Sequence, residues 1–274
     1  MLRAAAVLLL VALATTATAQ SVPRPPTSPR VVHAPTAWLQ PAGQLHVDLA
    51  ASHRLAPSAA ATFGLGVGEV ELELTDRLIA CPDCGELRAE ENFAAATAAF
   101  RMGAATSTAR PWRAGAVLGF RRTIATRTLA GSVGSPESGP LEAAQLHLVV
   151  GARVAGLEVH AGAELLQARH AGAGLDEGGE DGFVLRPLAA IAWTPPPYPR
   201  TTMLLDVAWV PELAARAPDL SWILGWGVRY QALPWGAIDL VVRQREDAAL
   251  GDATVLVRVS GVLKLGRPLG VDLR

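Results

Sequence analysis

The sequence has little of several features that mark common protein classes. Of its 274 residues, two are cysteine, 5% are aromatic and 18% are charged. The formal net charge of −1 excludes the basic surface on which nucleic-acid binding depends, so no nucleic-acid partner is expected. After the first twenty residues, no apolar run approaches the roughly 18 residues that a membrane-spanning helix needs. A helical membrane protein is therefore not expected either.

The N-terminus has the features of an export signal. Arg3 precedes an apolar run over residues 4–14, and Ala17-Thr18-Ala19 matches the small-residue pattern at a cleavage site. We expect a signal peptide over 1–19, with an uncleaved anchor as the alternative. The Pro-rich stretch that follows is expected to form a periplasmic N-terminal segment over 20–43, because prolines cannot enter a central strand.

The only two cysteines, Cys81 and Cys84, lie close together in Cys-Pro-Asp-Cys. In an exported protein this pair is expected to form a disulfide in a loop, because the compartment is oxidising. A zinc site would need two further ligands, and neither a second cysteine pair nor paired histidines lie nearby. We therefore expect no metal and no other cofactor.

Apolar residues recur at every second position along most of the remaining chain, which is typical of strands with one apolar face. Two local features conflict with this pattern. The Ala-rich stretch 90–102 has good helix propensity, and Pro187 removes an N–H donor from a strand that should pair on both sides. Eleven segments follow the alternation: 45–51, 70–74, 94–102, 112–120, 144–152, 157–165, 183–193, 201–209, 220–230, 238–242 and 255–265.

The charged residues of these segments occupy the intervening positions, and none lies on the alternating apolar face. The face that carries them also holds Asp48, Asp206 and Asp239, and some apolar residues such as Leu188 and Val241. We expect the following charged side chains to face a common interior: Glu69, Glu71, Glu73, Arg101, Arg113, Arg121, Arg153, Glu158, Glu164, Arg186, Arg229, Arg243 and Arg258.

The composition of the apolar face separates a membrane barrel from a soluble β-sandwich. A sandwich core needs large side chains to fill it, whereas this face is rich in alanine. In a transmembrane barrel the apolar face contacts lipid, where Arg or Lys at the midplane costs roughly 2 to 4 kcal/mol, so charge is excluded all around the ring. We therefore predict an all-β fold, an antiparallel up-and-down transmembrane β-barrel over 44–265, followed by a C-terminal tail over 266–274.

Aromatic residues and connection lengths support the same prediction. Aromatic residues fall mostly at strand ends, with Trp193 and Tyr230 in one set and Phe120 and Phe183 in the opposite set, as in the girdles at membrane interfaces. Short connections alternate with longer Gly-rich ones such as 123–142 and 167–182, which is typical of outer-membrane barrels.

Eleven strands would be an odd number, whereas bacterial single-chain barrels have even numbers, so about twelve strands are expected, within a range of 10 to 14. The stretch 70–79 contains Leu74-Thr75-Asp76-Arg77-Leu78. It resembles a strand, tight turn and strand that recur in outer-membrane barrels of Gram-negative bacteria. The resemblance places the twelfth strand at 78–82. It also implies outer-membrane lipid and the barrel-assembly machinery as partners, although the chain ends on Arg274 and lacks the usual terminal aromatic residue.

The connection Ala155-Gly156 is short enough to fix a register in which paired residue numbers add up to 311. This register places Arg153 opposite Glu158, and His147 opposite Glu164. Opposite charges across strands stabilise a hairpin by roughly 0.2 to 1 kcal/mol each, and a structural ladder is the favoured interpretation. The alternative is an acid–base pair of a lipid-modifying enzyme, which would also need a nucleophile or a metal beside the histidine.

These observations predict a narrow porin-like channel or a passive structural barrel with an ion-paired, mildly basic interior, and no enzyme activity. A mixture of charged and apolar inward residues favours a narrow or occluded conduit. The alternatives are a lipid-modifying barrel enzyme and a surface-interaction barrel that acts through its external loops. The sequence names no small solute.

Overall fold

The computed structural model describes residues 28–52, 58–75, 79–80, 93–105, 112–128, 141–170, 183–213, 219–246, 249, 251 and 253–265. No helix in these ranges is long and apolar enough to cross a membrane. The signal-peptide region and the pair Cys81 and Cys84 lie outside the described residues.

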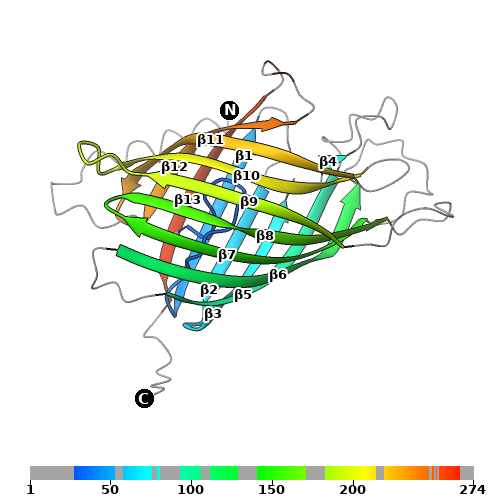
Figure 1. Cartoon of the computed structure of the whole chain (residues 1–274), viewed down its shortest axis with the longest axis horizontal. Helices are drawn as coiled ribbons and strands as arrows, with labels where there is room; N and C mark the ends of the chain where they lie inside the picture. The colour runs from blue at the N-terminus through cyan, green and yellow to red at the C-terminus, as the bar shows by residue number, and fades with distance from the viewer. Residues whose placement is uncertain are drawn as a thin grey trace, which may run out of the picture.

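Twelve antiparallel strands form a closed barrel (Figure 1). Each strand pairs with its neighbours in the chain, and the ring closes where the first barrel strand pairs with the last, from Gln44 opposite Lys264 to Ser52 opposite Leu256. The strands are β1 (Gln44–Ser52), β2 (Ser58–Gly64), β3 (Gly68–Thr75), β5 (Phe93–Ala105), β6 (Trp112–Thr128), β7 (Leu141–Val154), β8 (Leu157–His170), β9 (Val184–Trp193), β10 (Thr201–Leu213), β11 (Asp219–Leu233), β12 (Gly236–Arg245) and β13 (Thr254–Lys264).

The connections divide into a short-turn end and a long-loop end. The β7–β8 turn consists of Ala155 and Gly156, which both have positive φ (47° and 86°) as a tight two-residue hairpin requires. It sets the predicted register, with Arg153 opposite Glu158. At the other end of the barrel, β6 and β7 are separated by residues 129–140, and β8 and β9 by residues 171–183.

The two faces of the barrel wall differ as the alternation predicted. Large apolar side chains of the outer face are exposed, including Leu72 (56%) and Leu148 (52%), and alternate with buried residues on the same strands. Trp193, Tyr230 and Trp235 are exposed near the short-turn end. The wall therefore turns an apolar surface outward and its charged side chains inward.

The twelfth strand is not where the sequence analysis placed it. The missing barrel strand is β2, whose core Ala59-Ala60-Ala61 shows no contrast between its two faces and so escapes detection by alternation. Of the predicted strand at 78–82, the described residues are β4 (Ile79–Ala80), which is not part of the closed ring and pairs in parallel with Glu212 and Leu213 of β10. Because β3 pairs with β2 and β5, the predicted tight hairpin at Thr75–Arg77 was wrong.

Helix propensity in the stretch 90–102 is overridden by pairing. Residues 93–105 form β5, which pairs with β3 on one side and β6 on the other. Its alanines are small on both faces, so backbone pairing, rather than side-chain preference, determines the conformation.

We predict that Leu148→Arg, at the centre of β7, destabilises the barrel in phospholipid vesicles by about 2 to 4 kcal/mol, because the guanidinium would face hydrocarbon. The free energy of unfolding in denaturant measures this change. Gln145→Arg on the inward face of the same strand is the control and should cost far less. Equal costs at the two positions would contradict the assignment of the faces.

Candidate functional site

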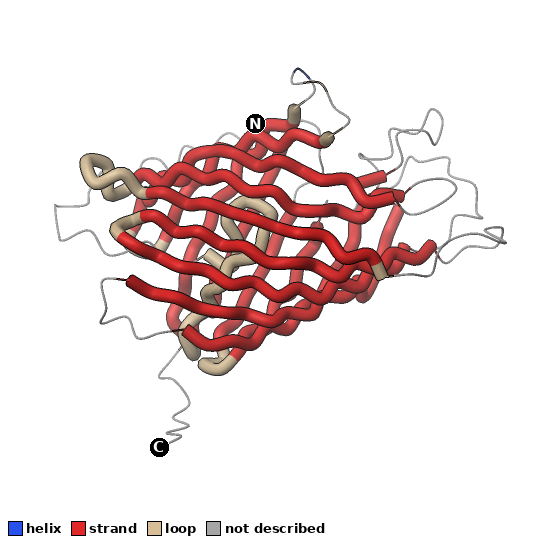
Figure 2. Tube along the Cα trace, in the orientation of Figure 1, coloured by secondary structure: helices blue, strands red, loops and turns tan. Residues whose placement is uncertain are grey.

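The interior of the barrel is occupied by the chain's own N-terminal segment. Residues 28–40, here called the plug, run inside the ring before the chain enters β1 at Gln44 (Figure 2). Ala34, Ala37, Trp38 and Gln40 are each no more than 1% exposed. The sequence analysis placed this segment in a periplasmic tail because prolines exclude it from the sheet. The prolines do keep it out of the wall, but the wall surrounds it.

The plug folds back on itself as a small hairpin. The N–H of Val31 donates to the carbonyl of Ala34 over 3.0 Å, and the N–H of Thr36 donates to the carbonyl of Pro29 over 2.9 Å. Arg30 and Pro35 form an isolated antiparallel bridge. The hairpin tip at residues 31–34 still leaves several backbone groups unpaired, and the barrel wall must satisfy them.

One side of the plug is held by charge. The Arg30 guanidinium donates to Glu73 over 2.6 and 2.7 Å and also to Glu71. Arg121 of β6 donates to the same two carboxylates, and Arg101 of β5 pairs with Glu69. Three carboxylates of β3 therefore face three guanidiniums, of which the plug supplies one. Removing Arg30 would leave a buried acidic excess.

Arg30 keeps its charge inside the barrel. Burial acts to lower the pKa of the guanidinium, but the carboxylates of Glu71 and Glu73 outweigh it and raise the pKa above its ordinary value. The positive charge of Arg30 is therefore permanent at any physiological pH.

The opposite side of the plug is held by backbone groups. The amides of Val32, His33 and Ala34 all donate to one oxygen of Asp206, over 2.8, 2.6 and 2.7 Å. Arg258 donates to the carbonyls of Val31 and Val32 over 2.7 and 3.0 Å. The tip thus finds partners for donors and acceptors that its own hairpin leaves free.

These two attachments span the lumen. In the ring order, β3 with Glu71 and Glu73 is separated by six places from β10 with Asp206 in either direction around the twelve strands, so the two lie on opposite walls. A chain bound to both walls crosses the full diameter of the barrel. The plug is therefore an obstruction of the conduit rather than a lining along one side.

Trp38 anchors the plug near the short-turn end. Its indole N–H donates to Glu158 over 2.8 Å, and its ring packs edge-on against His160. The guanidinium carbons of Arg113 and Arg153 lie 4.6 and 5.7 Å from the Trp38 ring centroid. Two like-charged side chains can lie this close because the ring face and Glu158 stabilise both.

Inward-facing glycines provide the space that the plug occupies. A Cβ on Gly115 of β6 would lie 2.7 Å from the carbonyl oxygen of Ala37, and one on Gly225 of β11 would lie 2.9 Å from Val32. A Cβ on Gly151 of β7 would approach the Ala37 side chain to 2.9 Å. Three strands thus lack a side chain at the points of contact with the plug.

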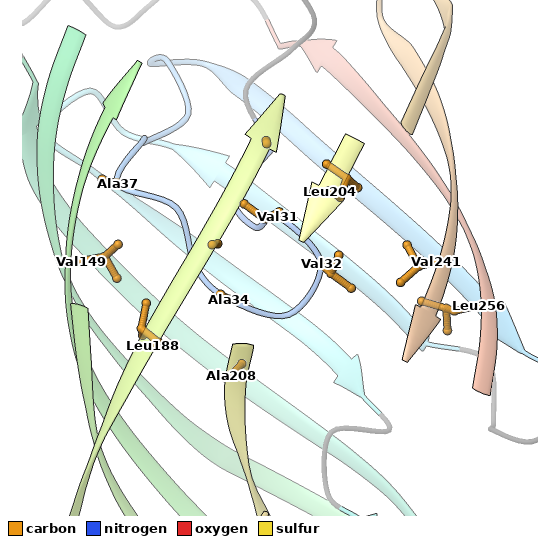
Figure 3. Packing of buried hydrophobic residues seen from close by; sticks show 12 residues of the cluster. Val31, Val32, Ala34, Ala37, Val149, Leu188, Leu204, Ala208, Val241 and Leu256 are labelled. Atoms are coloured by element: carbon orange, nitrogen blue, oxygen red, sulfur yellow. The ribbon is translucent and has the colours of Figure 1, made fainter. Parts of the chain in front are cut away.

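An apolar cluster completes the fit between plug and wall. Val31, Val32, Ala34 and Ala37 pack against inward apolar residues of the wall (Figure 3). Apolar side chains facing a water-filled lumen would lose the benefit of burial, whereas here they gain it. The wall partners are Val149, Leu188, Ala190, Ala192, Leu204, Ala208, Val241 and Leu256.

Two small cavities lie beside the plug among the described residues. A cavity of about 40 Å³ lies between the plug and the wall of β1, β2 and β13, and includes Arg30, Asp48 and Arg258 in its lining. A second, of about 10 Å³, lies beside Pro29, Arg101 and His147. These volumes hold a few water molecules and would not pass a hydrated solute.

The structure groups most of the charged residues proposed from sequence, and all thirteen are buried or half-buried. Arg186 lies opposite Glu164 across the β8–β9 ladder and stacks on Trp209, while Arg243 is buried in β12. Ten of the other residues form three groups: Glu69, Glu71, Glu73, Arg101 and Arg121 around Arg30; Arg113, Arg153 and Glu158 around Trp38; and Arg229 and Arg258 at Asp239. Glu164 of β8 lies opposite His147 on one side and Arg186 on the other.

His147 lies opposite Glu164, in the register expected from the turn. The histidine is 2% exposed and packs over Gly119, where an added Cβ would lie 2.2 Å from its Nε2 atom. Among the described residues, no three His, Cys, Asp or Glu side chains are grouped as metal ligands would be.

Arg30, Trp38 and His160 were not predicted from the sequence as interior partners. A signal for them is present: Gly115, Gly151 and Gly225 fall at inward positions of long strands, where a missing side chain indicates that something else approaches the wall.

No protein-family model matches the chain, and no curated protein is similar to it in sequence. Solved structures with a similar fold include a KdgM porin in complex with disordered oligogalacturonate (8% identity, TM-score 0.45, covering 81% of this chain and 99% of that one). Others are a loop-deletion mutant of OmpT, an outer membrane protein of Vibrio cholerae (11%, 0.38, 81% and 97%), and a BenF-like porin from Pseudomonas fluorescens Pf-5 (12%, 0.34, 76% and 55%). At such identities the likeness extends no further than the barrel fold.

We predict that Gly225→Val loosens the plug, because the new side chain would collide with Val32 and Asp206. Overpacking of this kind costs about 1 to 3 kcal/mol, so trypsin cleavage after Arg30 should accelerate by about tenfold or more. Mass spectrometry of the N-terminal fragments measures the rate. Gly261→Val is the control, because nothing lies within 3.6 Å of a Cβ at that site on β13. Identical rates in both variants would show that the plug does not contact β11.

Proposed function

We propose that the protein is an outer-membrane β-barrel of porin-like build whose lumen is closed by its own N-terminal plug. The observation that carries the proposal is the pairing of an apolar outer face with a polar lumen that the plug crosses from wall to wall. The export signal expected at residues 1–19 supports the location. In this form the barrel conducts small solutes only when the plug leaves.

The attachments of the plug suit a closure that can be reversed. It is held by ion pairs, by hydrogen bonds and by four small apolar side chains. None of the described plug residues belongs to the strand ladder of the wall. The plug can therefore leave without breaking a single hydrogen bond between barrel strands.

After the plug leaves, the lumen near the short-turn end should favour anions. Arg113 and Arg153 are paired neighbours on β6 and β7 and would lose the Trp38 ring that now lies against both. Interior basic residues placed to act on a passing solute include Arg113, Arg121, Arg153, Arg229, Arg243 and Arg258.

We predict that the full-length barrel is silent or nearly so in planar bilayers, whereas a variant lacking residues 28–38 conducts steadily. Arg30→Met should open the barrel part of the time, because breaking a buried ion pair costs about 3 to 5 kcal/mol. Arg30→Lys keeps the charge and is the matched control. Single-channel recording measures all four proteins, and heat-dependent gel mobility verifies that each has folded.

Two results would contradict this proposal. Large steady conductance of the full-length barrel would show that the plug does not close it. A folded but silent deletion variant would leave a passive structural barrel as the better description.

We further predict that the deletion variant prefers anions and that Arg113→Glu combined with Arg153→Glu reverses the preference, because the two side chains are adjacent in the lumen. The reversal potential in a salt gradient measures selectivity. Exchanging Arg122 and Arg127 for Glu, toward the long-loop end of the same strand, changes the net charge by the same amount and is the control. An unchanged reversal potential would remove these arginines from the conduction path.

A further inference from the structure

The ladder between β9 and β10 stops halfway along the barrel. Pairing runs from Met203 opposite Trp193 to Val207 opposite Ala189 and then ends. Both strands continue toward the long-loop end: β9 stays paired with β8 as far as Val184, and β10 stays paired with β11 as far as Glu212. The β6–β7 ladder also ends early, at Arg122 opposite Ala144, although β6 runs on to Thr128 and β7 begins at Leu141. Neither of those strand ends contains a proline, whereas both strands of the β9–β10 seam do.

Two prolines explain why the seam is open. Successive residues of a strand point their N–H and C=O groups toward opposite neighbouring strands. Because Thr194 donates its N–H to the carbonyl of Gly156 in the β7–β8 turn, the even-numbered residues of β9 point these groups toward β8 and the odd-numbered residues toward β10. Likewise the carbonyl of Arg200 accepts from Gln231, so the odd-numbered groups of β10 face β9. Pro187 and Pro211 both have odd numbers and both lack an N–H.

The two missing N–H donors fall in neighbouring hydrogen-bonded pairs of the ladder. If the β9–β10 register were extended, Trp209 would lie opposite Pro187, and Pro211 opposite Leu185. Of the four backbone groups that would then exchange hydrogen bonds, two have no hydrogen to donate. Pro187, which conflicted with a strand paired on both sides, fits a strand that is paired only with β8 at that point.

Side chains close the seam in place of the backbone. The indole N–H of Trp209 donates to the carbonyl of Pro187 over 2.7 Å, and the Arg186 guanidinium carbon lies 4.9 Å from the Trp209 ring centroid. Beyond them, β4 pairs with the free edge of β10, near the long-loop end (Figure 1). A rotamer change opens such a closure, whereas a ladder must break several hydrogen bonds at once.

The lumen wall next to the last pair of the seam is apolar, and the charged pair Arg186 and Glu164 lies further toward the long-loop end. Leu188 and Ala208, the residues immediately beyond the last pair, are 3% and 5% exposed and belong to the cluster that packs against the plug. A hydrocarbon chain that entered from the membrane beside Trp209 would meet apolar side chains on the inner face of the wall.

We propose that the β9–β10 seam is a lateral portal through which a single-chain amphiphile passes between the lumen and the surrounding membrane. The plug blocks the axial path toward the short turns, so a molecule that enters at the long loops leaves sideways. This proposal rests on the proposed membrane location of the barrel.

The test uses a cysteine that faces the lumen behind the seam. Ala208→Cys is made in a chain with Cys81→Ser and Cys84→Ser, reconstituted in phospholipid vesicles and exposed to a maleimide with a long alkyl chain that dissolves in the bilayer. Leu204→Cys is the matched control, because it faces inward on the same strand where the ladder is intact. We expect Ala208→Cys to react about tenfold faster than the control, because local opening is confined to the unpaired half.

A second pair of variants isolates the prolines. Pro187→Val with Pro211→Val restores both donors, so it should slow the labelling of Ala208→Cys several-fold and leave that of Leu204→Cys unchanged. Amide hydrogen exchange gives an independent measurement: Leu185 and Trp209 should exchange faster than Ile191 and Leu205, and the double variant should remove the difference.

Three results would overturn the portal. One is equal labelling of the two cysteines, and another is labelling that the proline variants leave unchanged. The third is equally fast labelling of Ala208→Cys by a water-soluble maleimide, which would show access through the mouth of the barrel. A wrong membrane location would appear separately, as extraction of the unlabelled protein from vesicles by alkaline carbonate.

Discussion

The structure depends on the requirement that each backbone amide find a partner inside the molecule. A sheet with edges cannot meet this requirement in hydrocarbon, whereas a sheet closed on itself can. The pairing of β1 with β13 is therefore the contact that makes the other contacts possible. Once the ring is closed, alternate side chains point outward toward lipid or inward toward the lumen. The chain places its apolar residues on the outside and its charges on the inside.

Closure creates a second requirement, because a ring of twelve strands encloses more space than its own inward side chains fill. The N-terminal segment meets it. Arg30 balances the acidic row of β3, and Asp206 receives three amides of the tip. Glycines of β6, β7 and β11 make the room. Plug and wall are complementary in charge, hydrogen bonding and shape, which indicates that the filled interior is the form for which both were built.

Sequence alone was sufficient for the features that repeat along the chain. The barrel class follows from alternation, and the β7–β8 register follows from a two-residue turn. It was insufficient where local signals are weak or where the partner is distant in the chain. In β2, three consecutive alanines make the two faces alike. The plug carries no periodicity, and Arg30 meets Glu71 and Glu73 only after the ring has closed around them. The Leu-Thr-Asp-Arg-Leu stretch misled because a short motif does not reveal which strand its neighbour will pair with.

The plug and the seam both reflect how backbone N–H and C=O groups find hydrogen-bond partners. Along the seam, Pro187 and Pro211 withhold donors from the ladder, and the inward residues next to its last pair, Leu188 and Ala208, are apolar. A barrel built only to be passive would gain stability from two ordinary residues there, since each would add a hydrogen bond in a setting where unpaired groups are costly. Prolines lie on both sides of this one seam, and the plug blocks the axial path. Both features fit a wall in which the opening of the β9–β10 seam contributes more to function than the stability of its pairing does.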